Sequence, residues 1–179
     1  MNITIKTSRT ILRPLTEKDV TPEYVHWLND IKINQYLESR FVCHTVLSVR
    51  SFVKTMNNDA SSYLFGIFID SKHIGNIKLG SINKNHLRAN IGLMIGDSDY
   101  WSQGIATEVI RAVTSFAFED KGIIKIDAGC YESNLASKKV FIKSGFEVEG
   151  FLKSHVINDG TREGVWLLGI TSEGMEQDK

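Results

Sequence analysis

The chain has 179 residues, of which 42% are hydrophobic, and its 21 basic side chains balance 21 acidic ones. This length and apolar share favour one compact domain spanning residues 1–179. Because the charges balance, the chain lacks the overall basic field that drives nucleic-acid binding, and no nucleic-acid partner is expected. Cys43 and Cys130 lie far apart without a CxxC pair. This argues against a disulfide scaffold or zinc ribbon and predicts two reduced, mostly buried thiols and no metal.

The sequence contains no apolar run typical of a leader or a membrane span. Its start, MNITIKTSRTILRPL, has no uninterrupted apolar stretch long enough for a signal peptide. Elsewhere no apolar run approaches the ~18–20 residues that cross a bilayer. We therefore expect a cytoplasmic protein without a membrane partner.

The first half of the chain is predicted to contain one strand, three helices and three further strands. Pro14 ends the first strand, Thr45 caps the third helix, and Asp70–Lys72 is the turn of a hairpin. Apolar residues at helical spacing or in strand-like runs mark the elements. They are a strand at Thr10–Leu15, helices at Glu17–Asn29, Ile33–Arg40 and Val46–Met56, and strands at Tyr63–Ile69, His73–Ile82 and Leu87–Ile95.

The second half alternates helices and strands and ends in two long strands. Gly145 stops the shorter helix, and Asn158–Gly160 joins the two terminal strands. The expected elements are a helix at Gln103–Glu119, a strand at Ile124–Cys130, a helix at Asn134–Lys143, and strands at Phe146–Ile157 and Thr161–Ile170. This order predicts an α/β (α+β) fold with a largely antiparallel central sheet of about seven strands and helices on both faces.

The segment YWSQGIATEVI, which begins at Tyr100, lies between a predicted strand and an amphipathic helix. Gly104 has no Cβ and lets the backbone approach a ligand closely, and Ala106 is also small. Free N–H groups in the first helical turn, at the positive end of the helix dipole, form an anion site that suits a pyrophosphate. Taken alone, the pattern equally fits a tight turn that starts a helix.

The same segment resembles the coenzyme turn of the Gcn5-related N-acetyltransferases (GNAT), whose pattern is Q/R-x-x-G-x-G/A. Trp101 occupies the Q/R position, as in the branch that resembles ribosomal-protein N-terminal alanine acetyltransferases. The resemblance implies acetyl-CoA as cosubstrate. It also implies coenzyme contacts along the turn, at Trp101, Ser102, Gln103, Gly104, Ile105, Ala106 and Thr107.

The resemblance continues on both sides of the turn. The block NLASKKVFIKSGF, from Asn134 to Phe146, resembles the family's N-x-x-S/A…GF block, and ILRPLTEKDV resembles its opening strand and helix. The resemblance implies that Asn134 contacts the pantetheine arm and that Ser137 flanks it. It further implies a GNAT-type sheet, in which a bulged strand pairs its backbone with the pantetheine amides at Leu93, Met94 and Ile95.

The implied reaction is attack of a neutral primary amine on the acetyl thioester. Many family members have a Glu where this chain has Asn90, and a Tyr that protonates the thiolate where this chain has Phe141. Phenylalanine cannot donate a proton. Their absence favours an acceptor amine of modest pKa, deprotonated through water. Glu132 is the preferred replacement base, although it also fits a solvated loop carboxylate; Tyr131, His26, Glu38 and His155 are the other candidates.

The most individual stretch, Tyr24–Arg40, is expected either to pack on the sheet as helices or to form an acceptor pocket. It resembles family members that acetylate amino groups of nucleotide-linked sugars, and Arg40 could then meet a phosphate. A protein N-terminal amine is the competing acceptor, and an antibiotic or polyamine is a third. The candidate acceptor contacts are His26, Trp27, Glu38, Arg40 and Asn90.

Two further alternatives stay open. A non-catalytic acyl-CoA-binding sensor or partner module fits the substitutions at Asn90 and Phe141. The long terminal strands, with Trp166 among apolar neighbours, fit either a homodimer interface or a core position. A nucleotide-binding domain is disfavoured, because the chain has neither GxGxxG after a first strand nor a Walker lysine.

Overall fold

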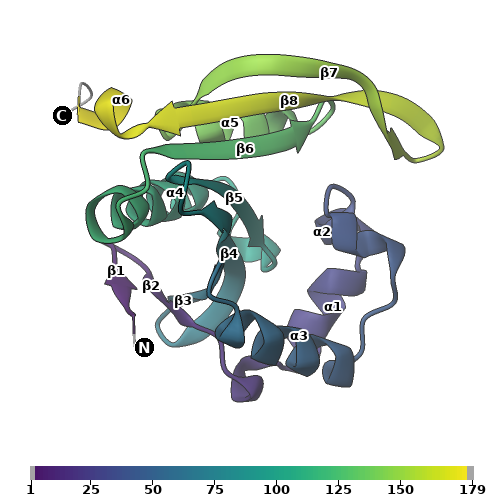
Figure 1. The fold of residues 1–179 in the computed structure, drawn as a ribbon. Coiled ribbons are helices and arrows are strands. Elements are labelled where there is room, and N and C mark those ends of the chain that lie inside the picture. The colour runs from purple at the N-terminus through teal and green to yellow at the C-terminus, as the bar shows by residue number, and fades with distance from the viewer. Residues whose placement is uncertain (1–2, 177–179) are drawn as a thin grey trace.

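The centre of the molecule is a mixed β-sheet (Figure 1). The structure is a computed structural model that describes residues 3–176. Within those residues the strand order is β1-β2-β3-β4-β5-β6-β8-β7, and every neighbouring pair is antiparallel except β5–β6. The strands are β1 (Ile5–Lys6), β2 (Ile11–Pro14), β3 (Tyr63–Ile69), β4 (Lys72–Asn83), β5 (Arg88–Ile95), β6 (Lys125–Tyr131), β7 (Glu147–Asn158) and β8 (Thr161–Thr171).

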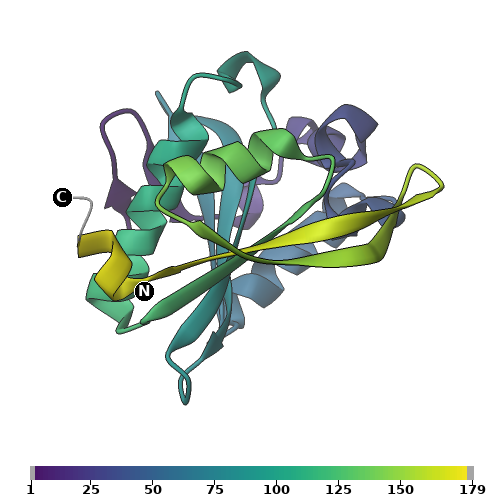
Figure 2. The ribbon, with the colours of Figure 1, turned by 90° about the horizontal axis from the view of Figure 1, so that it is seen from above.

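The predicted largely antiparallel sheet is confirmed, with one strand more than expected. The additional strand, β1, has two residues and pairs with Leu12 and Ile11 of β2. So short a segment has no detectable period, which is why its sequence pattern does not predict it. The terminal strands β7 and β8 form a long hairpin that extends beyond the rest of the sheet (Figure 2).

The helical region between β2 and β3 is more broken than the sequence pattern predicts. The single helix expected at Glu17–Asn29 is wrong: a 3₁₀ turn at Glu17–Asp19 precedes α1 (Pro22–Asn29). Proline disfavours helical backbone in the residue before it but fits the first helical position, so α1 begins at Pro22 with Thr21 as its cap.

The helix expected at Ile33–Arg40 is also wrong. Asp30 caps a short α2 (Ile31–Asn34), and a 3₁₀ turn follows at Glu38–Phe41. We call residues 35–45 the strap, because they cross from α2 to α3 without forming a regular helix. The third helix is confirmed as α3 (Val46–Asn58), and Thr45 caps it as predicted.

Two of the later helices lie where the sequence pattern predicts them. They are α4 (Ile105–Ser115), which continues as a π-helical turn at Phe116–Asp120, and α5 (Leu135–Lys143). The short α6 (Ser172–Glu176), which follows the last strand, was not predicted. Asn134 caps α5 by accepting a hydrogen bond from the Ser137 N–H at 3.1 Å.

Two apolar cores lie on opposite faces of the sheet, which accounts for helices on both sides. The larger core packs α4 and α5 against alternate residues of the strands, including Phe65, Ile77 and Ile91. The smaller core packs α1 and α3 against the other face and includes Trp27, Val53 and Met94. Figure 1 shows α1, α2 and α3 gathered on this second side.

The two cysteines differ in exposure. Cys130 on β6 is buried, as predicted, but Cys43 is exposed because it lies on the strap. The prediction of a buried thiol at Cys43 is therefore wrong. Within residues 3–176, no helix combines the length and the apolar character needed to cross a membrane.

Candidate active site

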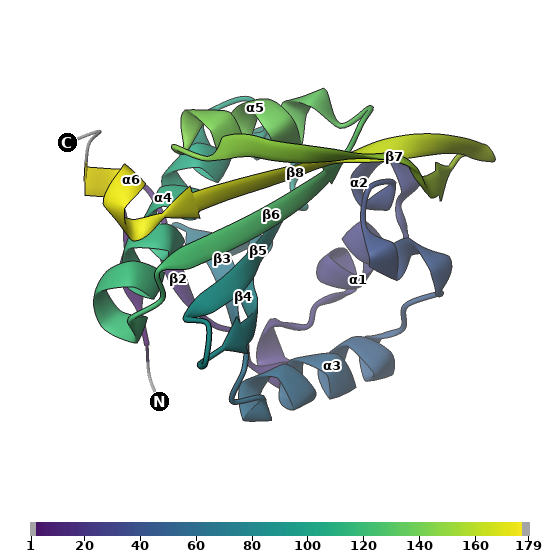
Figure 3. The same ribbon diagram turned by 45° about the horizontal axis from the view of Figure 1, so that its top comes forward.

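The site is built where β5 and β6 separate, a divergence that can be followed in Figure 1 and Figure 3. The two strands pair only through Arg88, Ala89 and Asn90 of β5. Beyond Asn90, β6 continues alongside β8, and no strand among residues 3–176 pairs with the edge of β5 from Ile91 to Ile95. Backbone N–H and C=O groups on such an edge need partners and can bind an extended ligand as another strand would.

The register irregularity beside this edge lies in β4. The pairing of β4 with β5 shifts between Gly80 and Asn83, so the extra residue belongs to β4. The bulge was expected on β5, the strand of Leu93, Met94 and Ile95, and this prediction is wrong because the irregularity lies on β4. Its physical consequence is a local bend just before β5 leaves β6.

A cavity of about 920 Å³, which we call cavity A, fills the gap between the diverging strands. Its walls come from the open part of β5, the start of α4, the end of β6, α5 and the strap. Its lining includes Tyr36, Leu37, Glu38, Ile91–Ile95, Tyr100, Trp101, Ser102, Gly104, Ile105, Ala106, Gly129–Tyr131, Asn134, Ser137, Phe141 and His155. A cavity of this size can enclose a ligand with an extended arm.

The turn before α4 presents unsatisfied N–H groups to cavity A. Gly104 is the N-cap of α4, has φ = 79°, and provides no side-chain hydrogen bond to the helix. The first N–H groups of a helix have no partner within the helix, and Gly104, Ile105 and Ala106 all line the cavity. The start of α4 is therefore free to bind an anion.

Three hydrogen bonds fix the position of this turn. The indole Nε1 of Trp101 donates to the Ile95 carbonyl at 2.8 Å, which ties the turn to the end of β5. Gln103 donates from Nε2 to the Asp99 carbonyl at 2.5 Å. Arg9 donates from Nη1 to the Gln103 carbonyl at 2.8 Å. The turn is thus fastened both to the strand and to the N-terminal segment.

Arg9 also pairs with Glu108 on the first turns of α4. Its backbone N–H and its Nε donate to the carboxylate at 2.9 and 2.7 Å. Partial burial alone would raise the pKa of Glu108, but hydrogen bonds from Thr7, Arg9 and Ser8 outweigh it and lower that pKa from 4.5 to about 2. The carboxylate is therefore charged in the folded protein at any pH above the acidic range.

This lowered pKa predicts how stability depends on pH. A depressed folded-state pKa contributes stability above the unfolded value of 4.5, and the contribution disappears as the pH falls towards 2. Glu108→Gln is expected to lower the free energy of unfolding at neutral pH by about 1.5–3 kcal/mol, the usual range for hydrogen bonds to charged groups. Urea unfolding of both proteins at a series of pH values measures this. The difference should vanish near pH 2; a constant difference would contradict the assignment.

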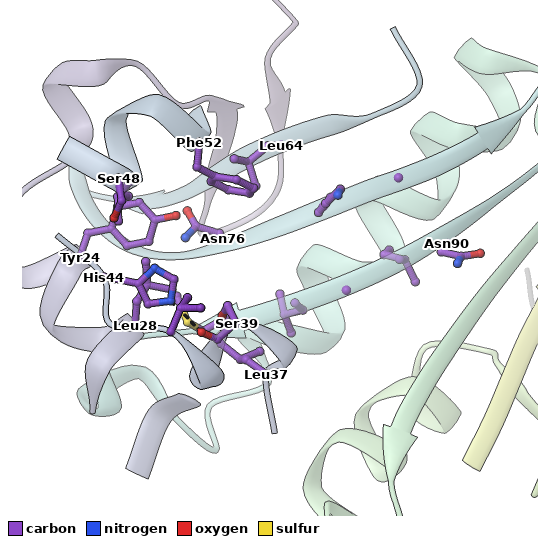
Figure 4. A pocket seen from close by; sticks show the side chains of 18 of the residues that line it. Tyr24, Leu28, Leu37, Ser39, His44, Ser48, Phe52, Leu64, Asn76 and Asn90 are labelled. Carbon is purple, nitrogen blue, oxygen red and sulfur yellow. Dashed lines mark hydrogen bonds between the residues drawn. The ribbon is translucent and has the colours of Figure 1, made fainter. Parts of the chain in front are cut away.

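A second cavity, cavity B, lies beside the same open stretch of β5 and has a volume of about 720 Å³. It is enclosed by α1, the strap and α3 on one side and by β4 and β5 on the other (Figure 4). Cavities A and B share Leu37 and the segment Ile91–Met94. The same stretch of β5 therefore lies between cavities A and B and lines both of them.

A polar cluster joins the strap to the end of β6. The Tyr131 hydroxyl donates to the Glu38 carboxylate and accepts a hydrogen bond from Arg40 Nη1 at 2.9 Å. Arg40 also donates from Nη2 to the Ile157 carbonyl on β7 at 3.0 Å. Burial, reinforced by the hydrogen bond to Glu38, raises the pKa of Tyr131. Its hydroxyl therefore stays protonated at neutral pH, on the wall of cavity A.

The structure brings most of the expected coenzyme residues together. Of that set, all except Gln103 and Thr107 line cavity A. Gln103 instead holds the turn through its side chain, and Thr107 belongs to the first turn of α4. The lining members are Leu93, Met94, Ile95, Trp101, Ser102, Gly104, Ile105, Ala106, Asn134 and Ser137.

The expected acceptor and catalytic residues are more dispersed. Glu38 lines cavity A, Asn90 lines cavity B, and Arg40 contacts the Tyr131 hydroxyl. Trp27 is 4% exposed and packs in the smaller core. The remaining two, His26 and Glu132, lie outside both linings: His26 is 3.7 Å from Asp30, and Glu132 accepts a hydrogen bond from the Gly164 N–H at 2.9 Å.

Two residues with clear roles at the site were not expected from the sequence. Arg9 fastens the turn, and Lys78 is a cation in the lining of cavity B. The sequence pattern could have indicated Lys78, because it is the single charged residue between Ile74 and Ile82 of an otherwise largely apolar predicted strand. Arg9 has none, since it lies in a polar segment distant in sequence from the turn.

Comparison with known proteins agrees with this geometry. Residues 9–147 match the family described as acetyltransferase (GNAT) domain. The uncharacterized N-acetyltransferase YoaA of Bacillus subtilis (strain 168) is 31% identical over 160 residues, which cover 88% of this chain and 90% of that protein.

Solved structures share the fold at low identity. RimL, a ribosomal L7/L12 alpha-N-protein acetyltransferase solved with coenzyme A, superposes with a TM-score of 0.84 at 19% identity, covering 96% of this chain and 99% of that one. Spermidine N-acetyltransferase from Vibrio cholerae, solved with CoA and spermine, gives 0.85 at 20% identity, covering 93% and 98%.

The family match and the relative together identify the class of protein. The chain belongs to the GNAT family and is an N-acetyltransferase. Members of this family use acetyl-CoA as the acetyl donor. Within residues 3–176, no group of three or more His, Cys, Asp and Glu side chains is arranged to hold a metal ion.

Proposed function

We propose that this protein transfers the acetyl group of acetyl-CoA, bound in cavity A, to a primary amine that enters through cavity B. The observation that carries the proposal is the shared segment Ile91–Met94, which lines both cavities. A thioester lying along this edge is reachable by an amine from the other side of the strand. Direct transfer requires such proximity and orientation of the two reactants.

The residues of cavity A fit the parts of the coenzyme. Free N–H groups at Gly104, Ile105 and Ala106 suit the pyrophosphate. The open β5 edge suits the two amides of the pantetheine arm. Asn134 uses its Oδ1 to cap α5, which leaves its Nδ2 as a donor on the cavity wall. Ser137 lies on the same wall.

The chain's own groups can supply the proton transfers. When bound, the coenzyme provides the thioester. A free β5 N–H can donate to the oxyanion that forms on attack. We assign proton donation to the leaving thiolate to Tyr131, because Phe141 cannot donate and the Tyr131 hydroxyl is protonated at the cavity wall. For this step the hydroxyl turns its one proton from Glu38 to the thiolate, and the phenolate is then reprotonated by the proton that Glu38 takes up from the amine. Glu38, which accepts the Tyr131 hydrogen bond, is positioned to take up a proton.

For the acceptor we propose a primary amine of modest pKa, either a protein N-terminal amine or the amino group of a nucleotide-linked sugar. An α-amine has a pKa near ~8, against ~10.4 for a lysine side chain, so it is neutral more often. Among the described residues that line cavity B, none is Asp or Glu. A polyamine such as the ligand in the Vibrio cholerae spermidine enzyme would find no carboxylate there.

Thiol release from acetyl-CoA tests the proposal. The panel is an N-terminal peptide, a nucleotide-linked amino sugar and spermidine, each with mass analysis of the product. We expect turnover with the peptide or the sugar and a product one acetyl group heavier. Binding of acetyl-CoA without thiol release for any amine would instead support an acyl-CoA sensor, the alternative that Phe141 and Asn90 suggest.

A further inference from the structure

The floor of cavity B is one face of the β4–β5 pair. Its residues stand directly opposite one another in the register: Asn76 with Met94, Lys78 with Gly92, and Gly80 with Asn90. Directly opposed residues project to the same face of a sheet, and all six line cavity B. Gly92, opposite Lys78, has no side chain, and a Cβ added there would meet nothing within 4 Å, so the floor beside Lys78 leaves space for a ligand.

Lys78 is the only lysine or arginine among the described residues that line this cavity. Its stem lies over Gly80, since a Cβ added to Gly80 would come within 2.6 Å of the Lys78 Cε. Among the side chains that the structure describes, no carboxylate is within 4.0 Å of its ammonium. Lys78 helps to lower the pKa of Asp59, but only as the last of several causes. The ammonium is thus available to an incoming anion.

The remaining wall of cavity B is largely apolar. Leu28, Leu37, Val49, Phe52 and Leu64 contribute to it. Figure 4 shows Leu28, Leu37, Phe52 and Leu64 gathered at one end, with Asn90 farther along its strand. Two polar side chains at that end are already engaged: His44 Nε2 contacts the Ser39 carbonyl at 2.8 Å, and Asn76 Oδ1 contacts His73 Nε2 at 2.9 Å. This end therefore suits an apolar group.

We propose that the acceptor is a primary amine with an apolar body and one anionic group, a carboxylate or a phosphate, that pairs with Lys78. This inference rests on the proposed function, because it assumes that the amine reaches the thioester from cavity B. The apolar body occupies the space beneath Phe52 and Leu64, and the anion lies beside the Lys78 ammonium. The absence of Asp and Glu from the described lining disfavours polycationic acceptors.

The test compares amines that share one apolar body. L-Leucine carries a carboxylate, its phosphonate analogue carries a phosphate-like anion, and L-leucinamide is neutral. Lys78→Met is expected to raise the KM for the two anionic amines about tenfold, as befits loss of a charge-assisted contact. The KM for leucinamide should stay the same. Comparing variant with wild type for each amine cancels differences in amine pKa.

Two further variants separate charge from structure. Lys78→Arg should restore most of the anionic preference. Gly80→Ala pushes the Lys78 stem aside and should raise the same KM values. Lys153→Met, on the exposed part of β7, is the matched control and should change nothing. An equal effect of Lys78→Met on leucine and leucinamide would overturn the inference, as would spermidine being the best acceptor.

Equilibrium binding separates this inference from the proposed function. Titration calorimetry with N-acetyl-L-leucine needs no turnover. If no amine releases thiol but this ligand binds the wild type more tightly than Lys78→Met, the proposed transfer fails and the anion site stands. If it binds both proteins equally, or neither, the anion site fails whatever the turnover shows.

Discussion

Gly104→Ala is expected to weaken acetyl-CoA binding at least about tenfold and to lower the free energy of unfolding by about 1–2 kcal/mol. Gly104 has φ = 79°, a left-handed conformation that costs a residue with a Cβ roughly that energy. The first turn of α4 can relieve this strain only by moving. Such a movement turns the N–H groups of Ile105 and Ala106 away from cavity A. Titration calorimetry with acetyl-CoA measures the affinity; about 1.4 kcal/mol corresponds to tenfold.

Gly122→Ala is the matched control for this prediction. Gly122 has φ = 64°, a Cβ added there meets nothing within 4 Å, and the residue lies outside the linings of both cavities. It should therefore show a similar loss of stability without a loss of affinity. If Gly104→Ala binds acetyl-CoA as well as Gly122→Ala does, the turn before α4 is not the anion site.

Tyr131→Phe is expected to lower kcat about a hundredfold while leaving the KM for acetyl-CoA within about twofold. General acid catalysis typically contributes 10²–10⁴-fold. The ring of Tyr131 would stay in place beside Tyr36, 5.9 Å away between ring centroids, so only the hydroxyl is removed. In the wild type the raised pKa keeps the Tyr131 hydroxyl protonated through neutral pH. Deprotonation of Tyr131 should therefore lower kcat only in the alkaline range.

Tyr63→Phe controls for the chemical change itself. Tyr63 stacks on Phe65 and lines neither cavity. A second comparison, Arg40→Met, removes one anchor of the strap but keeps the Tyr131–Glu38 pair. It should raise KM values more than it lowers kcat. A Tyr131→Phe enzyme with unchanged kcat would return the proton transfer to bound water or to another candidate such as Glu132 or His155.

The strands and the turn before α4 could be predicted from the sequence because both depend on local patterns. Continuous apolar runs define β3 and β6, and Gly104 with Ala106 defines the turn before α4, which lines cavity A. The helix boundaries near Pro22 were less predictable, since the apolar spacing runs through the proline without a break.

The acceptor side depends on contacts between distant segments, which no local pattern reveals. Trp27 has the residue type of a ligand contact, but it packs against Gly96, where any Cβ would collide with its ring. Lys78 and Asn90 become neighbours of one cavity only through the β4–β5 register. The Tyr131–Glu38–Arg40 cluster spans more than 90 residues of sequence.

Amide hydrogen exchange with and without coenzyme A tests the central claim most directly. The claim is that the coenzyme lies along the open edge of β5 and is anchored at the start of α4. Coenzyme A should slow exchange at the edge-facing amides of Ile91–Ile95 and at Ile105–Thr107, while the amides of β3, already paired on both sides, stay unchanged. Binding without protection of the β5 edge, or protection confined to cavity B, would contradict it.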